Sequence, residues 1–470
     1  MRVFLFLILI LGGAGAVFYY QGEFFERNSP NISFINIPKG LGADPSTITF
    51  EAKDDGIGLD EIVVRAEQLG KRVDIGSYKI LTQEKKSVSK TIEIKAKDLG
   101  LREGDVKFTA IAFDRSFFSN KQESSISLPV DFQKLKIAVI TPQQNINLGG
   151  SELVFFRVTG GTPARVGIRV GNDEFQGFPA GNTFKSLEKF KDLYYSFFVL
   201  PTTRTTETPE VFAQNKVGNE TRSGFPYLVI PRKFPELKIK IDDNFFEKTV
   251  SVLLARNQES LSSDSKERAK QFQDINEVYR ASLQEQIRKI MYSSSNASYS
   301  KSDKFFDGSF ARPMAGAPKS SYSERRNYIY KDEVISKSIH DGIDLAGTAM
   351  LPVQAALDGK IVFADFLGIY GNTVIIDHGC GFFTLYGHLS SIDKNVGDIA
   401  KKLEQIGRTG ITGLAAGDHL HFEIRVSGIP TSPIEWWDSS WVAEHIEKKI
   451  KFVMEQMGAQ AALEDAVENT

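Results

Sequence analysis

The 470-residue chain contains one cysteine, almost no net charge and no histidine in its first 339 positions. The lone Cys380 excludes an intramolecular disulfide framework, and it lies too deep in the sequence to carry a lipid at the N-terminus. A formal net charge of −2 gives no support for a nucleic-acid partner, because nucleic acids are bound by clustered lysine and arginine. The length exceeds what one hydrophobic core can serve, so we expect about three domains.

A long uncharged apolar run lies at the N-terminus, after Arg2. VFLFLILILGGAGAVFYY (Val3–Tyr20) is just long enough for a transmembrane helix, and its aromatic end suits a membrane interface. The run also reads as a signal peptide, with Ala14-Gly15-Ala16 as the cleavage site. We favour an uncleaved membrane anchor over residues 1–22 and keep the cleaved signal as the alternative. Either interpretation places the rest of the chain outside the cytoplasm.

The sequence from about residue 30 to residue 235 is typical of short β-strands separated by turns. Segments such as ITFEAK, EIVVRAE and VKFTAIAF alternate apolar and polar residues. A second series that includes KIAVITP, LVFFRVT and YYSFFVL starts after Phe132. We therefore predict two β-sandwich modules with immunoglobulin-like architecture, at residues 30–133 and 134–235.

The periodicity changes after residue 236. Between Ser265 and Tyr292, apolar residues recur every three or four positions, which indicates an amphipathic helix. The polar segment SSSNASYSKSD (Ser293–Asp303) that follows is typical of a linker. We assign residues 236–303 to a helical connector that packs against the next domain. A second helix is predicted to start near Trp441, so residues 441–470 form a C-terminal helix and tail.

Five of the six histidines lie between positions 340 and 421, and two short motifs carry three of them. HDGID contains His340 and Asp344, and its central Gly342 allows the backbone to bend so that both side chains converge. DHLHFEIRV contains His419 and His421 on an apparent strand, where alternation puts both side chains on the same face. The segment TLYGHLS between the motifs contains His388. This crowding indicates a metal site with acid–base groups beside it.

A catalytic zinc ion needs three protein ligands and one open position for water. His340, Asp344 and His421 meet that need, which leaves His388 and His419 for proton transfer and for stabilising an oxyanion. Zinc lowers the pKa of bound water and polarises a carbonyl oxygen, so such a site needs a group that takes the water's proton and one that stabilises the developing oxyanion.

Three other polar residues in this region are not assigned to catalysis. Glu423 falls on the same strand face as the HLH histidines, and we interpret it as a residue that could orient an imidazole. His378, in the segment IIDHG, is interpreted as a structural histidine. His445, on the predicted C-terminal helix, is expected to be solvated.

Four segments of this region resemble, in order and spacing, the lysostaphin/LytM-type zinc endopeptidases. They are HDGIDLAG, LPVQAALDGKIVFA, YGNTVIIDHGCGFFTLYGHLS and GDHLHFEIRVSGIPTSPIEW. SSYSERR (Ser320–Arg326) is similar to the loop that opens this domain. The resemblance covers about residues 305–437, so we assign residues 304–440 to a peptidase domain. It implies a mostly antiparallel β fold with the active site in a groove.

The resemblance also implies roles for individual residues. The family pattern places one Zn²⁺ on His340, Asp344 and His421, with His388 and His419 as the catalytic pair. All five positions hold the residue that the pattern requires, whereas degenerate family members that only activate other enzymes have lost ligands. The chain is therefore expected to be an active enzyme.

Members of this family cleave peptide bonds in peptidoglycan, and this substrate class agrees with export. The expected fold is mainly β and multidomain, anchored in the inner membrane with its bulk on the periplasmic side, or secreted. The β modules could contact cell-envelope proteins, and the connector could cover the groove and keep the enzyme latent. Two other functions stay open. One is a non-enzymatic wall-binding or amidase-regulating protein, and the other is a zinc protease for a protein substrate.

Overall fold

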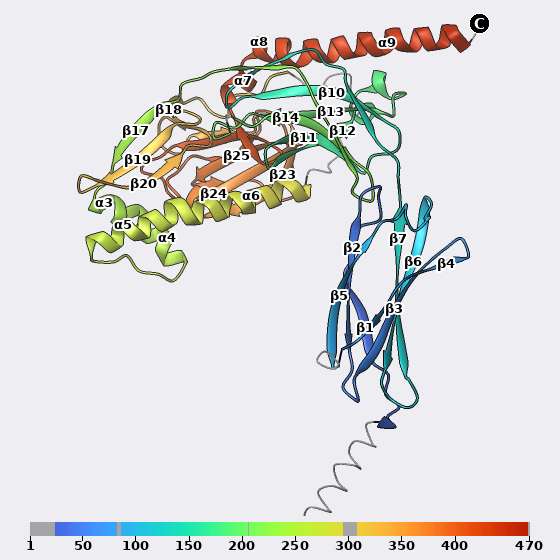
Figure 1. Ribbon diagram of the computed structural model, residues 1–470. Helices are drawn as coiled ribbons and strands as arrows, with labels where there is room; N and C mark the ends of the chain where they lie inside the picture. The colour runs from blue at the N-terminus through green and yellow to red at the C-terminus, as the bar shows by residue number, and fades with distance from the viewer. Residues whose placement is uncertain (1–23, 82–85, 205, 295–307, 469–470) are drawn as a thin grey trace, which may run out of the picture. The chain divides into compact units, whose positions relative to one another are not determined.

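The computed structural model describes residues 24–81, 86–204, 206–294 and 308–468, and the chain divides into two compact units (Figure 1). The first unit contains the residues up to Leu135 together with 160–164 and 214–221, and the second contains the rest. The segment 1–22, for which we predicted an anchor or signal, lies outside the described residues. Among the described residues, no helix is long and apolar enough to cross a membrane. The prediction of a mainly β, multidomain chain is confirmed.

The first unit is built from two antiparallel sheets that share one apolar core. Phe50, Val64 and Phe108 are fully buried in that core, which draws side chains from both sheets. Residues 24–135 therefore form a β-sandwich, whereas their relation to the immunoglobulin architecture remains a prediction. In spatial order, one sheet holds β1 (Asn31–Asn36), β2 (Ser46–Lys53) and β5 (Ser87–Ile94), and the other holds β4 (Lys71–Lys79), β3 (Leu59–Gln68), β6 (Gly104–Asp114) and β7 (Lys121–Val130).

Residues 134–235, predicted as a second β-sandwich module, have another arrangement of strands than the first unit. Their strands form one seven-stranded sheet and a separate parallel pair, β9 (Gln144–Asn147) with β16 (Tyr227–Ile230). The order in the large sheet is β15 (Glu220–Gly224), β14 (Pro209–Gln214), β11 (Arg165–Val170), β12 (Asp173–Pro179), β13 (Leu193–Val199), β10 (Ser151–Thr159) and β8 (Lys136–Val139).

The physical reason for this difference lies in strands β10 and β13. Both are buried along nearly their whole length, so each needs cover on both faces. Part of that cover comes from the C-terminal domain. The Phe197 ring lies 4.7 Å from the ring of Phe382, and the indole nitrogen of Trp436 donates a hydrogen bond of 2.9 Å to Ser151. The second β region and the peptidase region accordingly belong to one compact unit.

The C-terminal domain is centred on an eight-stranded sheet in which all neighbouring strands are antiparallel. Its two central strands, β25 and β29, are buried at every position. The sheet order is β18 (Ala317–Ser320), β21 (Ile343–Ala346), β29 (Leu420–Val426), β25 (Phe382–Leu389), β24 (Asn372–Gly379), β23 (Gly359–Phe366) and β27 (Ile399–Ala400), and β30 (Ile429–Thr431) also pairs with β29. A smaller sheet contains β22 (Pro352–Gln354), β28 (Gln405–Arg408) and β26 (Ser391–Ile392).

The connector packs against this domain along most of its length. Its strand β17 (Glu236–Lys240) runs parallel to β19 (Arg325–Tyr330), which pairs with β20 (Glu333–Ile339). The helical segments that follow are α3 (Asp243–Phe245), η3 (Phe246–Val250), α4 (Ser251–Arg256), α5 (Ser265–Gln273), η4 (Asp274–Tyr279) and α6 (Arg280–Ser294).

The predicted amphipathic helix is present, and it continues without a break from α5 through η4 to the end of α6. Its apolar side chains, including Leu283 and Ile287, share a core with Ile375 and Leu385 of the large sheet. Helix α6 lies along that sheet in Figure 1. Most of the predicted linker that follows falls on residues 295–307, outside the described residues.

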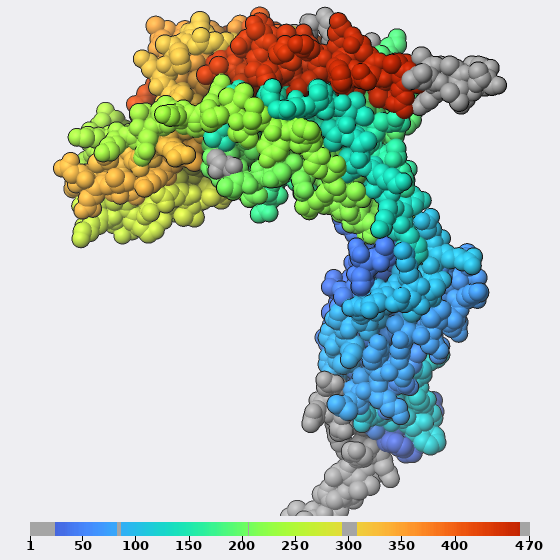
Figure 2. Space-filling view, turned by 45° about the horizontal axis from the view of Figure 1, so that its top comes forward, coloured from blue at the N-terminus to red at the C-terminus, as the bar shows by residue number. Residues whose placement is uncertain are grey.

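The chain ends in helices that pack against the seven-stranded sheet (Figure 2). Lys449 lies beside Glu152 of β10, and His445 Nδ1 lies 3.0 Å from the same carboxylate. The prediction of a solvated His445 is therefore wrong, because its imidazole also stacks on Trp441 at 4.9 Å. These elements are α7 (Pro433–Trp437), α8 (Ser439–Val442), η6 (Ala443–Glu447) and α9 (Lys448–Glu468).

Candidate metal centre

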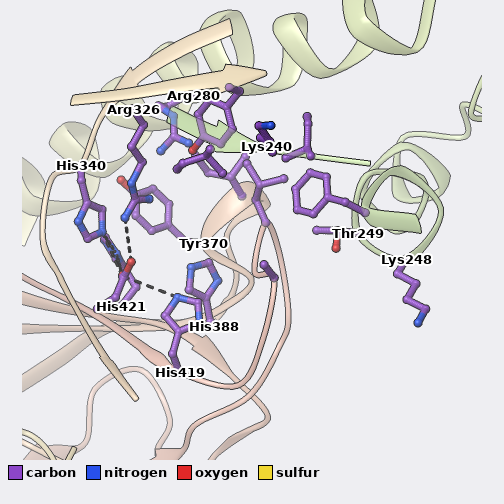
Figure 3. A pocket seen from close by; sticks show the side chains of 18 of the residues that line it. Lys240, Lys248, Thr249, Arg280, Arg326, His340, Tyr370, His388, His419 and His421 are labelled. Carbon is purple, nitrogen blue, oxygen red and sulfur yellow. Dashed lines mark hydrogen bonds and ion pairs between the residues drawn. The ribbon is translucent and has the colours of Figure 1, made fainter. Parts of the chain in front are cut away.

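Strand register brings the two histidine motifs together. Asp344 on β21 lies directly opposite His421 on β29, and His340 follows the end of β20. His340 Nε2 is 3.0 Å from Asp344 Oδ1 and 2.9 Å from His421 Nδ1, and the third separation, between Asp344 Oδ1 and His421 Nδ1, is 3.0 Å. Three potential ligand atoms thus lie close enough together to hold one metal ion, and Figure 3 shows the two histidines that supply two of them.

Gly342 of HDGID lies where there is no room for a side chain. A Cβ atom at Gly342 would lie 2.3 Å from the carbonyl oxygen of Phe422 and 2.8 Å from Cγ of Glu423. Any larger residue would push β21 away from β29 and separate Asp344 from His421. The glycine therefore serves the close approach of the two strands that carry donor atoms.

The outer nitrogen of each donor imidazole is already committed to a hydrogen bond. His340 Nδ1 donates to the carbonyl oxygen of Ser321 at 2.9 Å, and His421 Nε2 donates to Glu423 Oε1 at 2.8 Å. The inner nitrogens, His340 Nε2 and His421 Nδ1, and Asp344 Oδ1 lie 2.9–3.0 Å from one another, so the three atoms need a positive charge between them, which either a proton or a metal ion can supply. Two imidazoles with one carboxylate suit zinc. The residues present therefore fit a zinc ion.

The carboxylate of Asp344 is held in its ionised form. Burial alone would raise its pKa, but His340 and His421 together lower the pKa well below the usual value. Its second oxygen, Oδ2, accepts a hydrogen bond of 3.0 Å from Arg326, which is itself paired with Glu324. Arg326 therefore fixes one carboxylate oxygen and leaves Oδ1 directed at the two imidazoles. From the sequence, Arg326 was predicted only to lie in the loop that opens the domain.

His388 and His419 lie beside the three donors without joining them. Their ring centroids are 4.7 Å apart, and the ring of His388 lies 5.8 Å from that of His421. His388 Nδ1 donates to the carbonyl oxygen of Thr412 at 2.8 Å, and His419 Nδ1 donates to that of Gly417 at 2.7 Å. Both imidazoles are thus oriented by backbone carbonyls, and each keeps Nε2 for other partners. Burial and the neighbouring His419 and His421 hold the pKa of His388 well below its ordinary value.

A buried polar network supports His421 from behind. Glu423 pairs with the fully buried Arg425, whose charge and the contact with His421 hold the pKa of Glu423 far below its usual value despite burial. Arg425 Nη2 donates a hydrogen bond of 2.8 Å to Gln284 Oε1 on helix α6. The Gln284 amide also donates to Tyr370 Oη at 2.7 Å and to Asp341 Oδ2 at 3.0 Å. We had interpreted Glu423 as an orienting residue from the sequence, but nothing there pointed to Gln284.

The five histidine and aspartate side chains open into one cavity of about 460 Å³. Its other wall is built by the connector, from Ile239 to Thr249 and at Arg280 (Figure 3). Three cationic side chains, Lys240, Lys248 and Arg280, line this wall, and the carboxylate there, Asp242, accepts a hydrogen bond from a backbone amide of α3. The cavity is therefore a groove with the histidines on one side and, on the other, a wall of apolar and polar residues that carries three cationic side chains.

His378 and Cys380 do not belong to the groove. His378 is fully buried, with Nδ1 bonded to the carbonyl oxygen of Asp358 at 2.8 Å and Nε2 to Thr384 Oγ1 at 2.7 Å. Cys380 is also buried, and burial raises the pKa of its thiol to about 11. His378, with both ring nitrogens hydrogen-bonded, and the buried Cys380 are therefore interpreted as structural residues, as the sequence suggested for His378.

An antiparallel β domain with a His-Asp-His donor set in a groove defines a metallopeptidase-type architecture. Residues 338–433 match Peptidase family M23, so the chain carries an M23 peptidase domain at its C-terminal end. The chain is 44% identical over 96 residues to the DD-carboxypeptidase/endopeptidase Mpg of Neisseria meningitidis serogroup B, a match that covers 20% of this chain and 22% of that protein.

Two further proteins resemble the same region. Peptidoglycan DD-endopeptidase ShyA of Vibrio cholerae is 36% identical over 96 residues, covering 20% of this chain and 22% of that protein. The catalytic domain of lysostaphin from Staphylococcus simulans is 27% identical, with 26% of this chain and 92% of that structure covered at a TM-score of 0.23. The alignments thus span about a fifth of the length of each of the two curated relatives.

Proposed function

We propose that the protein is a zinc-dependent endopeptidase that hydrolyses peptide cross-links of bacterial peptidoglycan. The observation that carries this proposal is the set of three donor atoms, 2.9–3.0 Å apart, with His388 and His419 beside it in the same groove. The M23 match and relatives named as peptidoglycan DD-endopeptidases support the substrate class.

Each side chain of the centre has a distinct role in this proposal. His340, Asp344 and His421 would hold zinc, which when bound acidifies water and polarises a carbonyl oxygen. His388 and His419 would transfer protons and stabilise the negative charge that develops on the scissile carbonyl. Their Nδ1 atoms are tied to backbone carbonyls, so the Nε2 atoms are the ones that would exchange protons.

The groove suits an extended peptide that carries carboxylates. The connector wall offers the charges of Lys240, Lys248 and Arg280, and the Arg280 guanidinium is also held by a hydrogen bond of 2.7 Å to Asn276 Oδ1. Peptide substrates with free carboxylates would be attracted to this wall, whereas the opposite wall presents the catalytic histidines. We propose that the connector is part of the substrate site.

The proposed location is the cell envelope. Residues 1–22 would anchor the chain in the inner membrane with the folded units outside the cytoplasm, or would be removed on secretion. The β modules would then hold the peptidase domain at the wall and could contact other envelope proteins.

Digestion of purified sacculi by the full chain tests this function, with chromatography and mass spectrometry of the released muropeptides. Hydrolysis of cross-linked dimers to monomers that stops on chelation would support it. If the protein bound zinc but released no muropeptide, a wall-binding or amidase-regulating role would replace it. Cleavage of a protein substrate instead of sacculi would indicate a protease of another class.

The network behind His421 leads to a prediction for Gln284. In Gln284→Met the side-chain volume is kept, but Arg425, Tyr370 and Asp341 lose their shared partner. Because residues that orient a metal ligand typically contribute 10–100-fold in metal affinity, we expect zinc affinity to fall by about tenfold. Competition with a chromophoric chelator measures this change, and the unfolding temperature of the zinc-free protein reports any loss of general stability.

Gln273→Met is the matched control, because Gln273 lies on the same continuous helix and contacts Glu277 at 3.2 Å. This control should bind zinc as the wild type does. Equal zinc affinities for the wild type and both variants would show that the network does not support the metal centre.

A further inference from the structure

Four phenylalanine side chains form an exposed cluster at one end of the first unit. Phe24, Phe25, Phe117 and Phe118 are 38%, 50%, 64% and 46% exposed, and we call this set the aromatic patch. Neighbouring rings lie 5.2–6.1 Å apart, so the four side chains form one continuous apolar surface. Contiguous apolar surface of this kind on a folded domain marks an interaction site rather than a scattered exposed residue.

The backbone beneath the aromatic patch is held by several hydrogen bonds. The amide of Phe117 donates to the carbonyl oxygen of Phe24 at 2.7 Å, which ties the two segments together. Asn120 Nδ2 donates to the carbonyl oxygen of Glu26 at 3.0 Å. The buried carboxylate of Asp114 accepts from the backbone amides of Ser116 and Asn120 at 3.1 and 2.8 Å. The exposure of the rings is therefore built into the fold.

The neighbouring sequence indicates what covers the aromatic patch. Three residues, Gln21–Glu23, separate the end of the uncharged apolar run Val3–Tyr20 from Phe24, the first of the four phenylalanines. Four residue steps reach at most about 14 Å. If the run spans a bilayer, the aromatic patch must lie in or next to the interfacial layer, which is about 5–8 Å deep on each side of the hydrocarbon core.

We propose that the aromatic patch docks on the membrane surface, so that the first unit is seated against the bilayer at this end. This inference rests on the proposed retention of the N-terminal run and is independent of peptidase activity. The guanidinium of Arg27 lies 5.3 Å from the centre of the Phe118 ring, which places a cation beside the rings for lipid phosphates.

Tryptophan fluorescence of the full chain reconstituted in liposomes tests the proposal. The added emission is the difference between the spectrum of a variant and that of the wild type, which has three native tryptophans. For Phe118→Trp, phosphatidylcholine and phosphatidylglycerol brominated near the headgroup should strongly quench this added emission.

The control is Leu69→Trp, because Leu69 is 81% exposed and directly follows β3. The opposite end of β3 begins after Gly58, whose carbonyl oxygen accepts a hydrogen bond from Arg115, close to Phe117 in the chain. Leu69 therefore lies at the end of β3 away from the aromatic patch. The added emission of Leu69→Trp should show little quenching.

Equal quenching of the two added tryptophans would overturn the proposal. A blue-shifted Phe118→Trp emission that brominated lipid does not quench would also overturn it, because a second copy of the chain or the chain's own apolar run would then cover the patch. Release of muropeptides by the same preparations is measured separately. Loss of that activity would count against the proposed enzyme and not against membrane docking.

Discussion

Asp344→Ala is expected to abolish both zinc binding and peptidase activity. Asp344 Oδ1 lies 3.0 Å from each of the two imidazole nitrogens, and it supplies the only negative charge among the three donors. Without it, the neutral imidazoles cannot complete a three-ligand site. Metal content after desalting and release of muropeptides from sacculi are the two measurements, and both should fall to background.

Asp393→Ala is a suitable control, because Asp393 is a carboxylate of the same domain that lies outside the groove and accepts hydrogen bonds from the side chains of Ser391 and Gln405. It should keep both zinc and activity. If Asp344→Ala protein retained one zinc ion per chain, the metal would be held elsewhere. The assignment of His340 and His421 as zinc ligands would then also be wrong.

His388→Ala is expected to keep zinc and to lose turnover. His388 is not one of the three donors, and its imidazole is oriented toward them by the hydrogen bond to Thr412. General acid–base groups contribute about 10²–10⁴-fold to a rate, so kcat should fall by that factor while KM changes little. Steady-state cleavage of a soluble cross-linked muropeptide, together with metal analysis, separates the two effects.

His378→Gln provides the comparison, because His378 is also a buried histidine of the large sheet but lies outside the groove. Its replacement should lower the unfolding temperature and leave kcat nearly unchanged. If the His388 variant instead cleaved at the wild-type rate, His388 would not transfer the proton, and His419 would be left as the catalytic histidine.

The metal centre could be predicted from the sequence because its donors lie in short motifs. In HDGID and HLH the spacing within each motif, with period-two alternation in the strand, fixes which side chains share a face. What the motifs do not contain is the pairing of β21 with β29, which sets Asp344 opposite His421. The family resemblance supplied that long-range information.

The supporting residues could not be predicted, because they come from distant parts of the chain. Gln284 reaches Arg425 across 141 positions, and no pattern on an amphipathic helix marks a polar residue that will meet a buried arginine. The sequence also contains no pattern that predicts which connector residues line the groove. The core shared by α6 and the sheet also means that deleting the connector would expose apolar side chains, instead of simply uncovering a latent site.

The arrangement of the second β region could not be predicted for a different reason. Short strands with turns between them look alike whether a sheet faces a partner sheet or a neighbouring domain. The near-continuous apolar runs in LVFF and YYSFFV were the available signal, because a strand with one solvated face alternates and these strands do not.

Muropeptide analysis of sacculi digested by the purified, zinc-loaded full chain tests the central claim most directly. The account predicts that cross-linked dimers disappear, that peptide monomers accumulate, and that the His388→Ala protein with its zinc in place releases almost none. An unchanged muropeptide profile from a folded, zinc-containing wild-type protein would contradict it.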